Sequence, residues 1–267
     1  MQFETIRYEV EDRIATITLN RPDKLNAVSP QMAQELRAAY AAVESDEQVG
    51  IAVVTGSGRA FCAGADVVEI PDDGRVIYPE PYLTTLAQWE APQEATPPFR
   101  AMTKPILAAV NGLCCGAGLD LVTTGDIVIA SERAEFFDPH VSIGLVSGRE
   151  MVRLARVLPL NVAMRVALTG RHERMGAQRA YELGMVSEIV PHDRLLARAR
   201  EIATLVNRNA PLAVRGTRLA IRKGLDLPLH EAEILAEAFR ERVVRTDDAR
   251  EGPLAFVEKR PPQWKCR

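Results

Sequence analysis

Residues 106–120 read ILAAVNGLCCGAGLD, and residues 51–66 read IAVVTGSGRAFCAGAD. Each stretch begins as a short apolar run, which is typical of a strand buried on both faces of a parallel sheet. Each then passes through a turn of small residues toward a helix. Such a turn leaves backbone N–H groups without partners and lets a ligand approach them, so it suits a developing anion. Two such turns could face one oxygen atom.

The small residues of these turns have an alternative explanation. They could serve only to let a helix pack closely against the sheet, and a single turn leaves that alternative open. The presence of two similar turns favours binding. The sequence contains no Gly-x-Gly-x-x-Gly, Walker loop, His-Glu-x-x-His or Gly-x-Ser-x-Gly motif, which argues against nicotinamide, nucleoside triphosphate and serine hydrolase chemistry.

The segments outside the two turns predict an α/β fold. Residues 3–19 alternate between apolar and polar side chains on both sides of Glu11-Asp12, as a β-hairpin does. Ser29-Pro30 supplies an N-cap and a proline in the first turn of a helix expected to reach about Glu44. Residues 126–130 form another apolar, strand-like run. Strands that alternate with helices predict a largely parallel sheet.

The pattern beyond Gly148 is almost entirely helical, with helices expected at 149–157, 160–168, 175–183, 192–207, 211–223 and 229–245. Their apolar stripes exceed what one small layer can bury, so part of this surface is expected to pack against another subunit. We therefore divide the chain into an α/β core, residues 1–195, and a helical oligomerisation region, residues 196–267. Residues 71–98 are expected to leave the core as a lid or pocket wall.

The composition limits the classes of partner. The chain carries 33 basic and 36 acidic residues, a net charge of −3, and so lacks the basic field that nucleic acid or an anionic membrane requires. The N-terminus shows no signal sequence, and no apolar run approaches a membrane span, so we expect a soluble, cytoplasmic protein. The four cysteines show neither metal-ligand spacing nor a disulfide framework; we expect reduced thiols and no metal.

Several of these segments together resemble the crotonase family of enoyl-CoA hydratases and isomerases. The resemblance covers almost the whole chain, and it rests on five motifs: Leu19-Asn20-Arg21-Pro22, Asn26-Ala27, the F-x-A-G-A-D pattern of residues 61–66, residues 111–120, and Phe256-Val257-Glu258-Lys259-Arg260. It implies a spiral of ββα units followed by a helical C-terminal region that forms a homotrimer, commonly a dimer of trimers.

The resemblance also implies a substrate and a binding site for its reacting oxygen. The substrate is an acyl-CoA, with coenzyme A present only as the thioester part of the substrate and no permanently bound cofactor. The thioester oxygen accepts two backbone N–H bonds, which by position come from Ala65 and Ala117. The family usually has glycine at the second position, but alanine keeps the N–H group when its dihedral angles suit the turn.

Coenzyme A recognition is implied by the same resemblance. The backbone near residues 63–67 would contact the adenine, and residues 24–25 would lie near the pyrophosphate. Residue 259 would reach a coenzyme A phosphate from a neighbouring helix or subunit. Lys24 could equally be a solvated turn residue. The predicted coenzyme A contacts are Lys24, Leu25, Ala63, Ala65, Val67 and Lys259.

The predicted acid–base groups differ from those of the hydratases that the sequence resembles. Those enzymes use two glutamates, and the matching positions here hold Asp120 and His140, with Asp138 as an additional acid nearby. A carboxylate can orient an imidazole whose pKa begins near 6.5, so we predict an Asp120/His140 pair with His140 as the principal proton carrier. The alternatives are a solvated Asp120 and a structural His140. Arg149 and Glu150 could line the acyl pocket.

Three functions follow as hypotheses. The first is an enoyl-CoA hydratase or isomerase that stabilises a thioester enolate. The second is an acyl-CoA or carbon–carbon bond hydrolase of the same fold, in which His140 activates water. The third is a non-catalytic acyl-CoA-binding protein that retained the fold. Analysis of the products separates the first two, and binding without turnover would favour the third.

Overall fold

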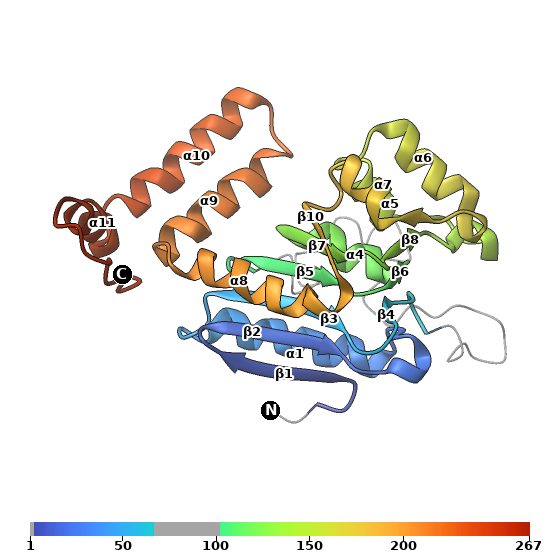
Figure 1. The fold of residues 1–267 in the computed structure, drawn as a ribbon. Coiled ribbons are helices and arrows are strands. Elements are labelled where there is room, and N and C mark those ends of the chain that lie inside the picture. The colour runs from blue at the N-terminus through green and yellow to red at the C-terminus, as the bar shows by residue number, and fades with distance from the viewer. Residues whose placement is uncertain (1–2, 67–101) are drawn as a thin grey trace.

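The computed structural model of the 267-residue chain describes residues 3–66 and 102–267. Within this part of the chain two sheets form the centre of the molecule (Figure 1). The larger sheet has the spatial order β1 (Ile6–Glu11), β2 (Ile14–Leu19), β3 (Ile51–Gly56), β5 (Ile106–Val110), β7 (Ile127–Ser131) and β10 (Glu188–Val190). The smaller sheet has the order β4 (Ala60–Cys62), β6 (Leu113–Cys115), β8 (Glu135–Phe137) and β9 (Met175–Gly176).

Most neighbouring strands are parallel, as the sequence predicts. Strands β1 and β2 form the predicted antiparallel hairpin, in which Ile6 pairs with Leu19, and every other pair in the larger sheet is parallel. In the smaller sheet β4, β6 and β8 are parallel, and β9 is antiparallel to β8. Because β4 follows β3 and β6 follows β5, each buried strand leads into a short second strand. The two turns of interest follow these second strands.

Helices cover the sheets and extend beyond them. The α-helices are α1 (Pro30–Ser45), α4 (Ala117–Thr124), α5 (Arg149–Leu154), α6 (Leu160–Thr169), α7 (Ala177–Glu182), α8 (Leu195–Asn207), α9 (Pro211–Gly224), α10 (Leu229–Val243) and α11 (Asp247–Val257). The 3-10 helices are η1 (Pro22–Lys24), η4 (His140–Ile143), η5 (Gly170–His172) and η6 (His192–Arg194). No helix in residues 3–66 or 102–267 has the length and apolar character to cross a membrane.

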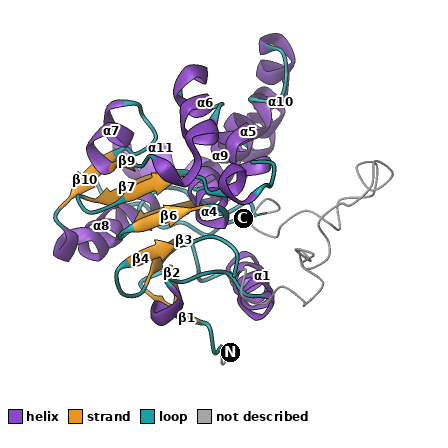
Figure 2. Ribbon diagram, turned by 90° about the vertical axis from the view of Figure 1, so that its right-hand side faces the viewer, coloured by secondary structure: helices purple, strands orange, loops and turns teal. Residues whose placement is uncertain are grey.

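The central strands of the larger sheet are buried on both faces. Alternate residues of β3 point to opposite sides: Val54 joins the cluster packed against α1, and Val53 joins the cluster packed against α8. Figure 2 shows α1 and α8 on opposite sides of this sheet. Each fully buried aliphatic side chain contributes about 1.5–3 kcal/mol. These clusters therefore make the sheet a rigid support for the turns at its edge.

The C-terminal half departs from the prediction in detail. It is not entirely helical, because β9 and β10 lie within it. The predicted helix at 192–207 begins as η6 and continues as α8, and an unpredicted helix, α11, follows α10. The side chains of Leu195, Ala199 and Ala203 bury α8 against the larger sheet. The domain boundary at residue 195 stays a prediction, and the predicted lid at residues 71–98 lies outside the described residues.

Asp126 links helix α9 to the core through three hydrogen bonds. Its carboxylate accepts a hydrogen bond from the N–H of Ile106 at 2.8 Å, from Arg218 Nε at 2.6 Å and from Arg222 Nε at 2.9 Å. Arg218 and Arg222 both belong to α9. A carboxylate shared between β5 and α9 therefore ties α9 to the sheet.

Candidate active site

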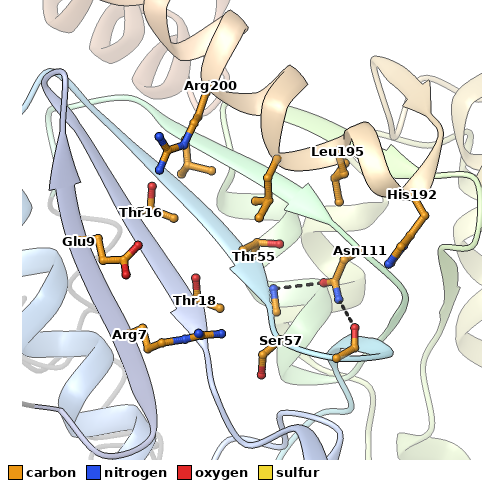
Figure 3. A pocket seen from close by; sticks show the side chains of 14 residues that line it. Arg7, Glu9, Thr16, Thr18, Thr55, Ser57, Asn111, His192, Leu195 and Arg200 are labelled. Carbon is orange, nitrogen blue, oxygen red and sulfur yellow. Dashed lines mark hydrogen bonds between the residues drawn. The ribbon is translucent and has the colours of Figure 1, made fainter.

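The connection between β3 and β4, which leads to the first glycine turn, is held in place by two buried asparagines. Asn26 donates two hydrogen bonds of 2.8 Å, to the carbonyls of Ser57 and Ala60. Asn111, which follows β5, accepts from the N–H of Gly56 at 3.1 Å and donates to the carbonyl of Gly58 at 3.0 Å (Figure 3). Buried polar groups are normally paired in this way. The connection from β3 to β4 is thereby fixed, and with it the start of the turn.

Three backbone hydrogen bonds join this turn to the segment that follows η1. Ala63 N donates to Leu25 O at 3.0 Å, Val28 N donates to Gly64 O at 2.8 Å, and Asp66 N donates to Val28 O at 3.0 Å. The structure therefore brings Leu25 and Ala63, two of the predicted coenzyme A contacts, side by side. Lys24 lies next to them and is exposed. Their binding of coenzyme A stays a prediction.

The two glycine turns meet. A Cβ atom added to Gly116 would lie 3.3 Å from the Cα of Gly64, and a Cβ added to Gly64 would lie 3.9 Å from the N atom of Ala117. Both glycines have positive φ angles, 94° for Gly64 and 52° for Gly116, which side chains disfavour. Conformation therefore favours glycine at both positions, and at Gly116 the 3.3 Å approach of the facing backbone adds a steric reason.

Both predicted oxyanion donors have N–H groups without a hydrogen-bond acceptor among the residues that the structure describes. Ala117 is the first residue of α4, so its N–H has no intrahelical partner, and Ala65 follows Gly64 in the facing turn. The positive end of the α4 dipole also lies at Ala117. The arrangement is suited to an oxygen atom that carries, or develops, negative charge.

His140 lies beside the second turn, but its partner is Asp138. The Nδ1 atom of His140 lies 2.7 Å from Oδ1 of Asp138, and the same oxygen accepts the backbone N–H of His140 at 2.9 Å. The Cε1 atom of His140 would lie 3.7 Å from a Cβ added to Gly116. Because Nδ1 is occupied by Asp138, Nε2 is the nitrogen available to a substrate.

Asp138 changes the ionisation of His140. The hydrogen bond from Nδ1 to Asp138 is the largest cause of a raised His140 pKa; burial opposes it, and the negative charges of Asp138 and Glu150 reinforce it. For Asp138, burial favours the neutral acid, but the hydrogen bonds from His140 outweigh it and lower the Asp138 pKa. The pair thus favours imidazolium against carboxylate, and His140 is suited to donate a proton near neutral pH.

The structure shows other partners for Asp120 than His140, so the Asp120/His140 pair stays a prediction without a contact to support it. Asp120 is buried, and its Oδ1 accepts from Arg153 Nη1 at 2.6 Å while its Oδ2 lies 3.4 Å from Arg149 Nη2. Both arginines belong to α5. Two neighbouring cations favour the charged form of a carboxylate, so Asp120 is suited to fixing α5 against α4.

The contact between Asp138 and His140 was predictable from the sequence, although it was not predicted. An aspartate side chain commonly accepts the N–H two residues later, and proline between them fixes the turn. The segment Asp138-Pro139-His140 has this form. Arg153 gave no comparable signal, because its contact with Asp120 depends on how α5 packs against α4.

The remaining predicted residues lie apart from the two turns or outside the described chain. Lys259 follows α11, which Figure 1 places at the opposite end of the molecule from β4 and α4, so a contact with coenzyme A would require another subunit. Val67 lies outside the described residues. Cys62 and Cys115 are free thiols whose pKa burial raises to about 12, so neither is a thiolate nucleophile at neutral pH.

Figure 3 shows a separate cavity of about 380 Å³ on the α8 side of the larger sheet. Thr18 and Thr55 form its floor, and Arg7 and Arg200 lie on its rim. None of the predicted site residues is among its described lining residues. Asn111 lines this cavity and also makes hydrogen bonds to the connection between β3 and β4. The cavity therefore lies next to that connection.

Comparisons with known proteins agree with the geometry. A family model described as enoyl-CoA hydratase/isomerase matches residues 9–267. The chain is 38% identical over 256 residues to the mevalonyl-coenzyme A hydratase of Aspergillus fumigatus, covering 94% of this chain and 91% of the relative. It is 32% identical over 258 residues to the 2,3-dehydroadipyl-CoA hydratase of Escherichia coli, covering 96% and 97%. A solved enoyl-CoA hydratase/isomerase from Mycobacterium paratuberculosis has a TM-score of 0.91 and 72% identity, with both chains fully covered.

Proposed function

This chain belongs to the enoyl-CoA hydratase/isomerase family, and on that premise we propose that it adds water to the double bond of an enoyl-CoA. The observation that carries the proposal is the contact between Gly64 and Gly116, which places the N–H groups of Ala65 and Ala117 in facing turns. A thioester oxygen between them would accept two hydrogen bonds. The two relatives named above are hydratases of CoA esters, which favours hydration over the other reactions of the fold.

The N–H groups of Ala65 and Ala117 together form the proposed oxyanion hole. In the proposed reaction this hole stabilises the negative charge that appears during addition. When oxygen adds to the β-carbon, the electrons of the double bond move toward the thioester and form an enolate. Ala65 and Ala117 donate to the enolate oxygen, each donor being worth roughly 10²–10³ in rate. His140, held by Asp138, gives its Nε2 proton to the α-carbon, a step worth roughly 10²–10⁴.

A second function is favoured by one observation, the His140–Asp138 pair. An imidazole held by a buried carboxylate can also activate water for attack on the thioester carbonyl, with the tetrahedral oxygen in the same hole. This reaction would release free coenzyme A. The raised pKa of His140 favours a proton donor over a base, so hydration is the better supported of the two.

The test is incubation of the purified protein with a panel of enoyl-CoA esters while product mass and free thiol are followed together. Hydration predicts a gain of one water without thiol release. An unchanged mass with a moved double bond would establish isomerisation, and thiol release would establish the hydrolase. Tight binding without any product would establish a non-catalytic acyl-CoA-binding protein.

We further propose that the chain assembles as a homotrimer or a dimer of trimers. The proposal is supported by large apolar side chains that are exposed in the single chain. Leu225, directly after α9, is 65% exposed, Leu229 of α10 is 75% exposed, and Phe256 of α11 is 85% exposed. Apolar surface of this extent is typical of subunit interfaces. Light scattering coupled to gel filtration would measure the assembly, and a monomer would contradict the proposal.

A further inference from the structure

Glu150, the second residue of α5, is a buried carboxylate that the proposed reaction has not used. Its residue is only 9% exposed, and its side chain makes no hydrogen bond or ion pair with any residue that the structure describes. The buried side-chain atoms without a partner in the described part of the chain are Asp138 Oδ2 and Ser147 Oγ, so the unpaired oxygens of Glu150 keep contact with solvent. Glu150 is therefore a mostly buried residue whose carboxylate is open to water.

The fold directs Glu150 toward the candidate active site. On α5, Arg149 and Arg153 are four residues apart and both approach Asp120 of α4, which defines the face of α5 that packs against α4. Glu150 is three residues before Arg153 and therefore lies on the same side. Its negative charge also acts on His140. Glu150 and His140 thus belong to one site.

The contrast with Asp120 decides which carboxylate is available to a water molecule. Both oxygens of Asp120 face guanidinium groups, at 2.6 Å from Arg153 and 3.4 Å from Arg149. Asp138 holds His140 through Oδ1, and its Oδ2 is buried without a hydrogen-bond partner and so closed to solvent. Among the described carboxylates around His140, Glu150 is the one whose two oxygens are both unpaired and in contact with solvent. A carboxylate with free lone pairs beside an imidazole can hold water between them.

We propose that Glu150 is the base that activates the attacking water, so that His140 and Glu150 together perform the hydration. The inference rests on the proposed function. Glu150 accepts one proton from water, and the water oxygen forms a bond to the β-carbon. The double-bond electrons form the enolate, and the imidazolium of His140 protonates the α-carbon. The product is the hydroxyacyl-CoA, and transfer of the proton from Glu150 to His140 restores the starting state.

The test separates the two proton transfers. Glu150→Gln keeps the size of the side chain and removes the base, so hydration should fall roughly 10²–10⁴-fold. Exchange of the α-protons of a saturated acyl-CoA in D₂O needs the hole and His140 but no attacking water. This exchange should therefore keep its wild-type rate in Glu150→Gln and be lost in His140→Gln.

Glu132 provides the matched control, because it is exposed at the end of β7 and has no side-chain partner among the described residues. Glu132→Gln should leave both reactions unchanged, and circular dichroism should show that both variants are folded. Wild-type hydration in Glu150→Gln would overturn the assignment, and so would an equal loss of exchange and hydration. An absence of hydration in the wild-type protein would instead overturn the proposed function, so the two failures are distinguishable.

Discussion

The two sides of the candidate site are built from different parts of the chain. The proposed anion-binding side consists of backbone N–H groups at Ala65 and Ala117, fixed by two glycine turns and by buried asparagines. The acid–base side consists of side chains, and His140 depends on a carboxylate two residues away. Backbone groups change little when side chains are substituted. Members of one fold can therefore keep an anion hole while the acid–base groups, and with them the reaction, change.

The largest expected effect falls on the acid–base side. His140→Ala removes the proposed proton donor, so kcat for hydration should fall roughly 10²–10⁴-fold. His172 is an exposed histidine in η5, and His172→Ala serves as the matched control with unchanged kcat. Steady-state kinetics on the best enoyl-CoA would measure both. Unchanged turnover in His140→Ala would contradict the assignment.

The anion-binding side is tested by removing a single N–H group. Ala117 is the first residue of α4, a position that tolerates proline, so Ala117→Pro removes the donor while the helix is retained. The loss of one donor should lower kcat roughly 10²–10³-fold. Ala117→Gly keeps the N–H group and should keep the activity. Equal kinetics for the proline and glycine variants would show that Ala117 is not a donor.

Asp120 should matter more for stability than for proton transfer. Asp120→Asn weakens the contacts with Arg153 and Arg149, and the free energy of unfolding should fall by about 1–3 kcal/mol. The pH profile of kcat should keep its shape, because Asp120 does not hold His140. Denaturant unfolding and kinetics on the same preparation would check this. If the pH profile of kcat shifts while the free energy of unfolding stays unchanged, the predicted pairing of Asp120 with His140 would be supported instead.

Asp138→Asn should shift a pH dependence. Since Asp138 raises the pKa of His140, its loss lowers that pKa, and the alkaline limb of activity should move to lower pH. The stability contribution of the raised His140 pKa is complete below its ordinary value of 6.5 and is lost as pH rises through the raised value. The stability contribution of the lowered Asp138 pKa is complete above the ordinary aspartate value of 3.8. It is lost as pH falls through the lowered value.

The pair therefore stabilises the fold most between pH 3.8 and 6.5. The difference in Tm between the wild-type protein and Asp138→Asn should be largest in this window and should shrink on both sides of it. Thermal unfolding followed by circular dichroism at a series of pH values would measure it. A difference in Tm that does not vary with pH would mean that the two groups are not linked in this way.

The smallest effect is expected at the predicted coenzyme A contact. Lys24 is exposed in η1, and a single solvated charge near a phosphate contributes little. Lys24→Ala should raise KM a few fold and leave kcat unchanged, as loss of uniform binding does. The increase in KM should diminish at high salt. A reduced kcat would place Lys24 closer to the chemistry than the sequence suggests.

The sequence predicted the backbone of the site better than its side-chain contacts. Residues 51–54 and 106–110 are continuous apolar runs, and the glycine turns beyond them carry their own conformational signal, so local pattern was sufficient. The three-residue strands β4, β6 and β8 are too short to show a period. The contacts of Asp120 with Arg153 and Arg149 were not predictable, because they depend on the packing of α4 against α5.

The central claim, that two facing backbone turns form one anion hole, is tested most directly by a crystal structure with a saturated acyl-CoA bound. The thioester oxygen should accept hydrogen bonds of about 2.7–3.2 Å from both Ala65 N and Ala117 N. The α-carbon should face Nε2 of His140. A thioester oxygen bound by neither N–H group, or an acyl chain that enters the cavity next to the β3–β4 connection, would contradict the claim.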